Sequence, residues 1–250
     1  MNYKDTYQDW LQNPYFDEAT KEELRAIADD EKEVEDRFYR QLEFGTGGLR
    51  GVIGAGTNRM NIYTVRQATQ GLANYIISQN GQDKGVAIAY DSRIMSPEFA
   101  TEAALCLNAN GIKTYRFTSL RPTPELSFAV RKQGCIAGIV ITASHNPREY
   151  NGYKVYWEDG AQITPPHDKN ILAEVAKVTS FDLVKTMDAS KAREAGLYHE
   201  IDQEIDDAYM AELKKQSIHP EVISEMAKDF TIVYTPLHGT GNIPVRRVLK

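Results

Sequence analysis

Residues 142–147 are Thr-Ala-Ser-His-Asn-Pro, and they follow an apolar run, Cys135 to Ile141, that has the composition of a buried strand. The chain becomes apolar and aromatic again at Tyr153 to Trp157. Ser144 and His145 are therefore expected at the carboxyl end of a central strand, in a short polar loop that the proline stiffens. Open α/β sheets bind their ligands at that edge, so this loop is the expected functional site.

The chemistry open to Ser144 is limited by its neighbours. A free serine is a weak nucleophile and needs an activating group. The chain has no G-x-S-x-G around Ser144, and adjacent side chains on a strand point to opposite faces, so a serine hydrolase has little support. A phosphoryl group on the serine would bring nearly two negative charges and would need cations, which Arg50, Arg148 and Lys154 can supply. The alternative is an ordinary serine in a polar turn.

The wider sequence favours the phosphoryl interpretation. Residues 142–147, followed by Asn151-Gly152-Tyr153-Lys154, resemble the active-site serine loop of the α-D-phosphohexomutases, the phosphoglucomutase and phosphomannomutase superfamily. Three further stretches resemble motifs of the same family in the same order: FGTGGLRG at 44–51, YDSR at 90–93 and YTPLHGTG at 234–241. The first of these is most similar to the phosphoglucomutase/phosphopentomutase branch. The resemblance covers residues 40 to 250.

This resemblance implies an isomerase that transfers phosphate within a sugar. It would interconvert a hexose 1-phosphate and 6-phosphate, or pentose 1- and 5-phosphates, through a phosphoserine and a bisphosphorylated sugar. Ser144 would carry the phosphoryl group, with His145 assisting proton movement. The expected catalytic residues are Ser144, His145, Lys154 and Arg50. The residues expected to bind substrate or phosphate are Arg50, Arg93, Asn146 and Lys154.

The resemblance also implies Mg²⁺ and a sugar bisphosphate activator. The metal would contact the phosphate on Ser144 and carboxylates of an Asp-Gly-Asp-x-Asp-Arg loop, which this sequence does not contain. The family's sugar-contacting Glu-x-Ser-Gly motif is absent too. Because the sequence stops at Lys250, inside the expected first helix of a second domain, we expect the N-terminal part of a longer enzyme, inactive or severely impaired alone. The alternative is a catalytically incomplete module that binds sugar phosphates or another partner.

Composition is that of an ordinary globular protein. The 250 residues are 42% hydrophobic and 26% charged, and the formal net charge of −6 argues against a nucleic-acid partner. The polar N-terminus is not a signal peptide, and no apolar run is long enough for a membrane span, so we expect a cytoplasmic protein. No protein partner is indicated. Cys106 and Cys135 are expected to be buried thiols, and the five histidines lack metal-ligand spacing.

Hydrophobic periodicity predicts a three-layer α/β/α domain with a mostly parallel mixed sheet, followed by the start of a second similar domain. The predicted helices are 64–79, 96–110 with Ser96 as N-cap, and 123–132, and the predicted strands are 86–90, 113–117, 135–141 and 152–157. The strand-end loops 91–93, 118–123 and 142–147 should meet at one edge. Arg93 could orient the serine loop or pair with Asp91.

The flanking segments complete the prediction. Residues 1–40 form a helical extension with a capping box from Thr20 to Glu23, residues 41–202 the main domain, and residues 203–250 the start of the second. The glycine-rich stretch 44–60, with Arg50, suits a phosphate-cradling loop. Toward the C-terminus we expect an irregular segment at 179–202, helices at 203–215 and 221–228, and a strand at 230–234.

Overall fold

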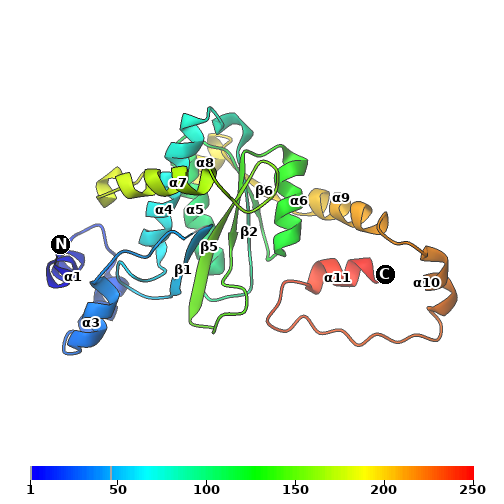
Figure 1. Ribbon diagram of the computed structural model, residues 1–250, viewed down its shortest axis with the longest axis horizontal. Coiled ribbons are helices and arrows are strands. Elements are labelled where there is room, and N and C mark those ends of the chain that lie inside the picture. The colour runs from blue at the N-terminus through cyan, green and yellow to red at the C-terminus, as the bar shows by residue number, and fades with distance from the viewer. Residues whose placement is uncertain (1, 46) are drawn as a thin grey trace.

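A six-stranded mixed sheet forms the centre of the molecule (Figure 1). The computed structural model describes residues 2–45 and 47–250. The strand order is β1-β5-β4-β2-β3-β6, and β5 is antiparallel to both of its neighbours, while the pairs β4–β2, β2–β3 and β3–β6 are parallel. The mostly parallel mixed sheet is therefore confirmed. The strands are β1 Gly48–Val52, β2 Val86–Tyr90, β3 Thr114–Phe117, β4 Ala137–Ile141, β5 Tyr150–Trp157 and β6 Tyr198–Ile201.

Helices cover both faces of the sheet because its central strands are apolar on both sides. Strand β2 shows this directly: Val86 and Ile88 join one buried cluster with α4 and α5, and Ala87 and Ala89 join another with α6 and α9. Alternate residues of a strand point to opposite faces, so one strand contributes to both cores. The covering helices are α4 Ile62–Ser78, α5 Ser96–Ala109, α6 Thr123–Gln133, α7 His167–Lys177, α8 Ala189–Glu194 and α9 Gln203–Lys214.

The N-terminal helices pack against the main domain through aromatic side chains. They are α1 Tyr3–Gln12, α2 Glu18–Ala26 and α3 Glu31–Phe38. Trp10 is buried, with its ring 4.1 Å from that of Phe16 and 5.6 Å from that of Tyr63 on α4. The predicted capping box at Thr20 is wrong: Asp17 caps α2 and accepts a hydrogen bond from the Thr20 amide at 2.7 Å. The carboxylate of Asp17 thus satisfies the amide that the prediction assigned to Glu23.

The chain begins α5 differently from the prediction as well. Ser96 lies inside the helix and is fully buried, and Met95 takes the N-cap position with φ 64°. The Ser96 hydroxyl is 2.8 Å from Asp91 Oδ1, to which it donates a hydrogen bond, and so it joins the helix to the end of β2. The Ser96 hydroxyl therefore bonds to Asp91, just after β2, and does not cap its own helix as the sequence pattern predicted.

Three flanking segments differ from the sequence-based prediction. Part of the glycine-rich stretch forms edge strand β1 beside β5, and part of the segment expected to be irregular forms β6 beside β3. Residues 230–234 are exposed and form no strand, because none of the described strands pairs with them. These errors concern pairing partners far away in the sequence, which periodicity does not reveal.

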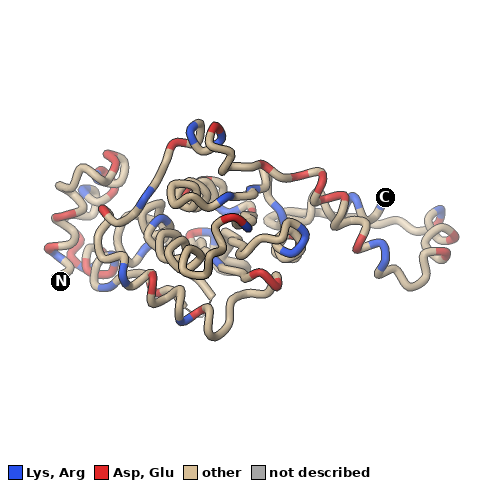
Figure 2. Tube along the Cα trace, turned by 90° about the horizontal axis from the view of Figure 1, so that it is seen from above, with Lys and Arg blue, Asp and Glu red and all other residues tan. Residues whose placement is uncertain are grey.

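The C-terminal segment leaves the sheet and returns to it (Figures 1 and 2). After α9, the chain forms α10 Pro220–Met226, runs extended through Tyr234, and ends in α11 Asn242–Val248 beside α9. Its large apolar side chains, among them Ile218 and Val233, are exposed. Among the described helices, none has the length and hydrophobicity needed to cross a bilayer.

Gly48 controls the approach of β1 to β5. Its φ is 146°, and a Cβ at this position would lie 1.7 Å from the Tyr153 carbonyl oxygen. We expect Gly48→Ala to lower the free energy of unfolding by about 3 kcal/mol or more, because backbone atoms must separate. Gly111→Ala is the control: its φ is 75° but no atom lies within 4 Å, so only strain of about 1–2 kcal/mol is expected. Urea denaturation measures both, and equal losses would contradict the steric explanation.

Candidate active site

The serine loop begins directly after β4 and has an unusual backbone conformation at Ser144. The Ser144 φ is 55°, in the left-handed region that costs a non-glycine residue about 1–2 kcal/mol. Its amide donates to Thr142 Oγ1 at 3.0 Å, and its side chain is exposed. The hydroxyl therefore projects from the carboxyl edge of the sheet, as the sequence predicted.

The guanidinium of Arg93 holds this loop through hydrogen bonds to its backbone carbonyls. Its Nη2 donates to the carbonyls of Ser144 at 2.7 Å and Asn146 at 2.6 Å, and its Nη1 to those of Pro147 at 2.9 Å and Tyr150 at 3.0 Å. One guanidinium thus binds four carbonyl oxygens, which a planar, rigid set of donors can do. These bonds hold Ser144 in its strained conformation.

Asp91 supports Arg93 in turn. Its Oδ1 accepts a hydrogen bond from the Arg93 amide at 3.0 Å, and its Oδ2 lies 3.5 Å from Arg93 Nε. Both roles considered for Arg93, orienting the serine loop and pairing with Asp91, occur together. The guanidinium of Arg93 is already bonded to these carbonyls and lies beside Asp91. The predicted contact between Arg93 and phosphate therefore stays a prediction.

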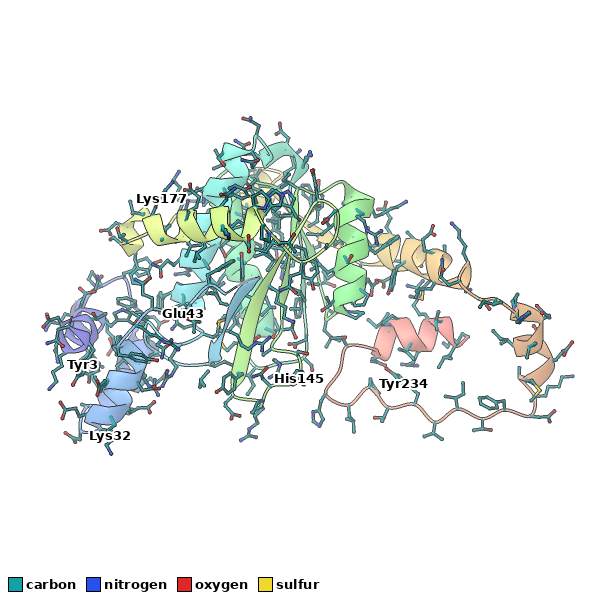
Figure 3. The ribbon with its side chains drawn as sticks, in the orientation of Figure 1. Tyr3, Lys32, Glu43, His145, Lys177 and Tyr234 are labelled. Atoms are coloured by element: carbon teal, nitrogen blue, oxygen red, sulfur yellow. The ribbon has the colours of Figure 1, made fainter. Side chains whose placement is uncertain are left out.

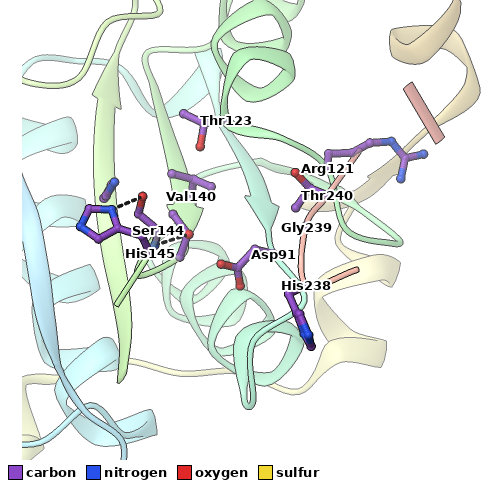
Figure 4. Close-up of a pocket in the computed structure, with 11 residues that line it drawn as sticks. Asp91, Arg121, Thr123, Val140, Ser144, His145, His238, Gly239 and Thr240 are labelled. Atoms are coloured by element: carbon purple, nitrogen blue, oxygen red, sulfur yellow. Dashed lines mark hydrogen bonds between the residues drawn. The ribbon is translucent and has the colours of Figure 1, made fainter. Parts of the chain in front are cut away.

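His145 lies beside the serine hydroxyl, with its Nδ1 3.4 Å from Ser144 Oγ (Figure 4). Its side chain is exposed, at the lower end of the sheet in Figure 3. Asn146 is half-buried, and its Oδ1 is a buried acceptor with no hydrogen-bond partner. The loop thus presents a hydroxyl and an imidazole side by side.

Lys154 and Arg50 come to the same site from β5 and β1. Gly48 pairs with Lys154 and Arg50 with Gly152, so the two cations are diagonal neighbours on one face of the antiparallel pair. Burial lowers the pKa of Lys154 from its ordinary value of 10.5; the charge of Arg50 lowers it further, and Asp91 opposes the shift. A lysine in this setting loses its proton more readily than one in water.

Two cavities meet at Lys154. One, of about 390 Å³, contains Ser144, and the other, of about 340 Å³, contains Arg50 and the glycine-rich stretch. We call the first the serine pocket; it is lined by Asp91, Arg121, Thr123, Val140, Thr142, Ser144, His145, Lys154, His238, Gly239 and Thr240. The structure thus brings Ser144, His145 and Lys154 into one cavity, and Lys154 links it to Arg50.

The serine pocket includes residues that sequence reasoning missed. Arg121 and residues 238–240 contribute to its wall, opposite Ser144 (Figure 4). Residues 238–240 belong to the YTPLHGTG motif, which the sequence analysis noted, but the motif did not indicate that they line the serine pocket. Arg121 lies in a strand-end loop that was expected at this edge, yet its own part in the site was not predicted.

The described residues do not form a magnesium site by themselves. Asp91 is the one carboxylate that lines the serine pocket, and its oxygens accept from Arg93 and Ser96. Across residues 2–45 and 47–250, no group of three or more His, Cys, Asp or Glu side chains is arranged to hold a metal ion. Further oxygen ligands would be needed beside a phosphate on Ser144.

The fold and site define a class: an α/β/α domain that presents an exposed serine on a clamped strand-end loop. The family described as phosphoglucomutase/phosphomannomutase, alpha/beta/alpha domain I, matches residues 41–182, and this chain belongs to that family. A phosphopentomutase of Pongo abelii is 38% identical over 250 residues, covering 96% of this chain and 40% of that protein. A phosphoglucomutase of Staphylococcus epidermidis is 34% identical over 244 residues, covering 98% and 41%.

Solved structures agree with the fold. A protein of Thermus thermophilus described as a phosphomannomutase superposes with a TM-score of 0.67 at 25% identity, covering 84% of this chain and 43% of that one. The open form of pp63/parafusin from Paramecium gives a TM-score of 0.64 at 20% identity, covering 84% and 41%, and shows likeness of fold alone. The chain spans about 40% of the length of the curated relatives it matches.

Proposed function

We propose that this chain carries the phosphoserine-bearing domain of a sugar-phosphate mutase. The mutase would move phosphate between positions 1 and 6 of a hexose, or 1 and 5 of a pentose. The observation that carries the proposal is the placement of Ser144: exposed, strained at φ 55°, clamped by Arg93, and in one cavity with Lys154. The names of the relatives, phosphopentomutase and phosphoglucomutase, support the same class of substrate.

The proposed reaction transfers one phosphoryl group in each step. A sugar hydroxyl attacks the phosphorus of phosphoserine 144, the bond from phosphorus to Oγ breaks, and a bisphosphorylated sugar forms. The proton of the sugar hydroxyl leaves to a base, and Oγ regains a proton. The bisphosphate then returns its other phosphoryl group to Ser144 by the reverse of these bond changes.

The side chains around Ser144 suit these steps. His145 Nδ1, 3.4 Å from Oγ, can give a proton to Oγ or take one from it. Lys154, whose pKa is lowered by burial and by Arg50, can accept a proton when neutral or neutralise phosphate charge when protonated. Arg50 adds a second positive charge on the same face. Magnesium in the whole enzyme would supply further charge neutralisation, from ligands that the described residues do not provide.

Two rival functions predict different behaviour. A serine hydrolase of the α/β-hydrolase class has its nucleophile between a strand and a helix, whereas Ser144 lies between strands β4 and β5, next to His145 in the sequence. A non-catalytic sugar-phosphate-binding module is favoured by the lack of a carboxylate cluster among residues 2–45 and 47–250. It would bind the sugar phosphate without covalent change.

The test is a single-turnover reaction with glucose 1,6-bisphosphate and ribose 1,5-bisphosphate, each with magnesium. It follows only the first phosphoryl transfer, to Ser144, so it does not depend on the full catalytic cycle, in which this part of the enzyme is expected to be impaired. The proposal predicts release of sugar monophosphate, up to one equivalent per chain, because Ser144 keeps the other phosphoryl group. Ser144→Ala should release none, and Ser92→Ala, which removes an exposed serine of the neighbouring strand-end loop, should behave as wild type. Binding without release would favour the non-catalytic module, and labelling of Ser144 by a fluorophosphonate would favour the hydrolase.

The protonation of Lys154 gives an independent test of the electrostatics. Arg50→Gln removes one cause of its lowered pKa, so the titration of Lys154 should move to higher pH. At any one pH near neutrality, acetic anhydride should then modify Lys154 more slowly than in wild type, since neutral amines react. Peptide mass spectrometry measures the rate, with Lys132 as internal reference. Arg148→Gln, an exposed change in the serine loop, should leave the rate unchanged. An unchanged rate in Arg50→Gln would contradict the coupling.

A further inference from the structure

A buried ionic bridge joins the edge of the sheet to the C-terminal helices. Arg121, 3% exposed, donates through Nε to Asp206 Oδ1 at 2.8 Å and through Nη2 to Oδ2 at 3.0 Å. Arg247 of α11, which is partly exposed, lies on the other side: its Nη1 is 3.4 Å from Asp206 Oδ2, and its Nη2 donates to Asp207. Arg121, Asp206 and Arg247, which we call the latch, connect the β3–α6 loop, α9 and α11.

The latch is joined to the serine pocket by the chain itself. Arg121 lines the pocket with its stem while its guanidinium points away from Ser144 (Figure 4). Residues 238–240, which lie on the same side of the pocket as Arg121, come just before α11, which carries Arg247 (Figure 4). The latch therefore connects that wall, through α11, to α9 and to the loop that carries Arg121.

A fourth side chain, Glu125, lies beside the latch and has no hydrogen bond from its nearest cation, Arg121. Glu125, on the first turn of α6, is 1% exposed, and its Oε2 has no hydrogen-bond partner. Its Oε1 is 3.9 Å from Arg121 Nε, whose hydrogen bond goes to Asp206. An ionised carboxylate is costly in such a place, whereas a protonated one is tolerated.

The pKa values of the two buried carboxyl groups, Glu125 and Asp206, are shifted in opposite directions. Burial, and next the neighbouring Asp206, raise the pKa of Glu125 to about 8. Burial also acts to raise the pKa of Asp206, but hydrogen bonds, first from Arg121, outweigh it and hold that pKa below its ordinary value. At neutral pH the pair therefore holds one proton and one negative charge, and the charge faces the two arginines.

We propose that the latch is controlled by a proton: Glu125 in its neutral form keeps it closed and thereby positions the 238–240 wall of the serine pocket. Arg121 and Asp206 are then positioning residues for Ser144. This inference concerns the chain's own architecture, and it stands whether or not Ser144 accepts phosphate.

The direction of the pH effect follows from the charges that face Glu125. The charged and titratable groups around it are Arg121 in the β3–α6 loop, Asp206 and Tyr209 on α9, and Arg247 on α11. Asp202, the residue before α9, pairs with Arg121. Ionising Glu125 puts a second negative charge beside Asp206. Because the folded state binds this proton more tightly than the unfolded chain, the stabilisation is complete below pH 4.5 and is lost as the pH rises through about 8.

Hydrogen exchange of the full chain tests the proposal. Protection of α9 and α11 is measured by mass spectrometry from pH 6.5 to 9.5, corrected for the intrinsic exchange rate, with α4 as reference for global folding. In wild type, protection of α9 and α11 should fall as the pH rises from 6.5 to about 8, by up to about tenfold per pH unit for one ionisation, and should level off above pH 8, where Glu125 is ionised in both states, while α4 stays protected. Glu125→Gln, which is always neutral, should keep protection at every pH.

Two further variants complete the design. Asp206→Asn, which weakens the bridge itself, should show low protection of α9 and α11 at every pH. Glu212→Gln, the same substitution at an exposed site on α9, should retain the wild-type profile. A Glu125→Gln profile that follows wild type, or wild-type protection that is constant from pH 6.5 to 9.5, would overturn the proposal.

A direct titration keeps the proposal falsifiable if Glu125→Gln does not fold. The carboxyl ¹³C resonances of a glutamate-labelled wild-type chain report each glutamate's protonation. One resonance should titrate near pH 8, where the loss of protection in α9 levels off. Titration of every glutamate in the ordinary acidic range would overturn the proposal.

Discussion

Replacing Ser144 with alanine is expected to reduce phosphoryl acceptance from a sugar bisphosphate to background, a loss of more than about 1000-fold. No other hydroxyl in the serine pocket has the same setting. Thr142 is buried and its Oγ1 accepts from the Ser144 amide, and Thr123 and Thr240 lie across the cavity from Ser144 (Figure 4). Quench-flow measurement of sugar monophosphate release gives the rate in each variant.

The loss in Ser144→Ala should be chemical and not structural. The side chain is exposed, and its hydroxyl makes one long contact, to His145, so the free energy of unfolding should change by less than about 1 kcal/mol. The backbone strain at φ 55° remains in both proteins. Residual phosphoryl acceptance above background in a folded Ser144→Ala protein would mean that another group is the acceptor.

Arg93→Ala should cause the second-largest loss, about 100-fold in phosphoryl acceptance, because a misplacement of about 1 Å at the reacting hydroxyl has an effect of that size. Four carbonyls around the serine loop lose their common donor, and Ser144 can relax out of the left-handed region. Arg93→Lys should resemble Arg93→Ala, since an ammonium group lacks the planar set of donors. Single-turnover rates measure the effect.

The control for Arg93 is Arg131→Ala, an exposed arginine at the end of α6 whose Nε donates to Ser127 O. It should leave the rate unchanged. If Arg93→Lys kept the wild-type rate, the positive charge of Arg93 would matter and the clamping of the loop would not.

The sequence predicted the location of the site because its central elements are locally consistent. Continuous apolar runs bounded by glycine and proline indicated β2 and β4 within one or two residues of their observed limits, and parallel strands bring their carboxyl ends to one edge. The meeting of the 91–93, 118–123 and 142–147 loops followed from topology. Asp91, Arg121 and Ser144 do line one cavity.

The contacts that position the site residues join segments far apart in the sequence, so local sequence patterns did not reveal them. Arg93 binds carbonyls 51 to 57 residues away, and the Arg121–Asp206 pair joins residues 85 apart. Strand β1 was not predicted because glycine is compatible with many backbone conformations and so does not indicate a strand. The structure shows that Gly48 is required there, because a side chain would collide with the Tyr153 carbonyl. Strand β6 was hidden because only pairing with β3 makes a polar tetrapeptide a strand.

The most direct test of the account is the location of phosphate after reaction of the full chain with glucose 1,6-bisphosphate and magnesium. Peptide mass spectrometry of the product identifies the modified residue and its occupancy. Phosphate is expected on Ser144 alone, at the same level in Ser92→Ala and absent in Ser144→Ala. Phosphate on another residue, or an unmodified Ser144 in a folded chain that binds the sugar bisphosphate, would contradict it.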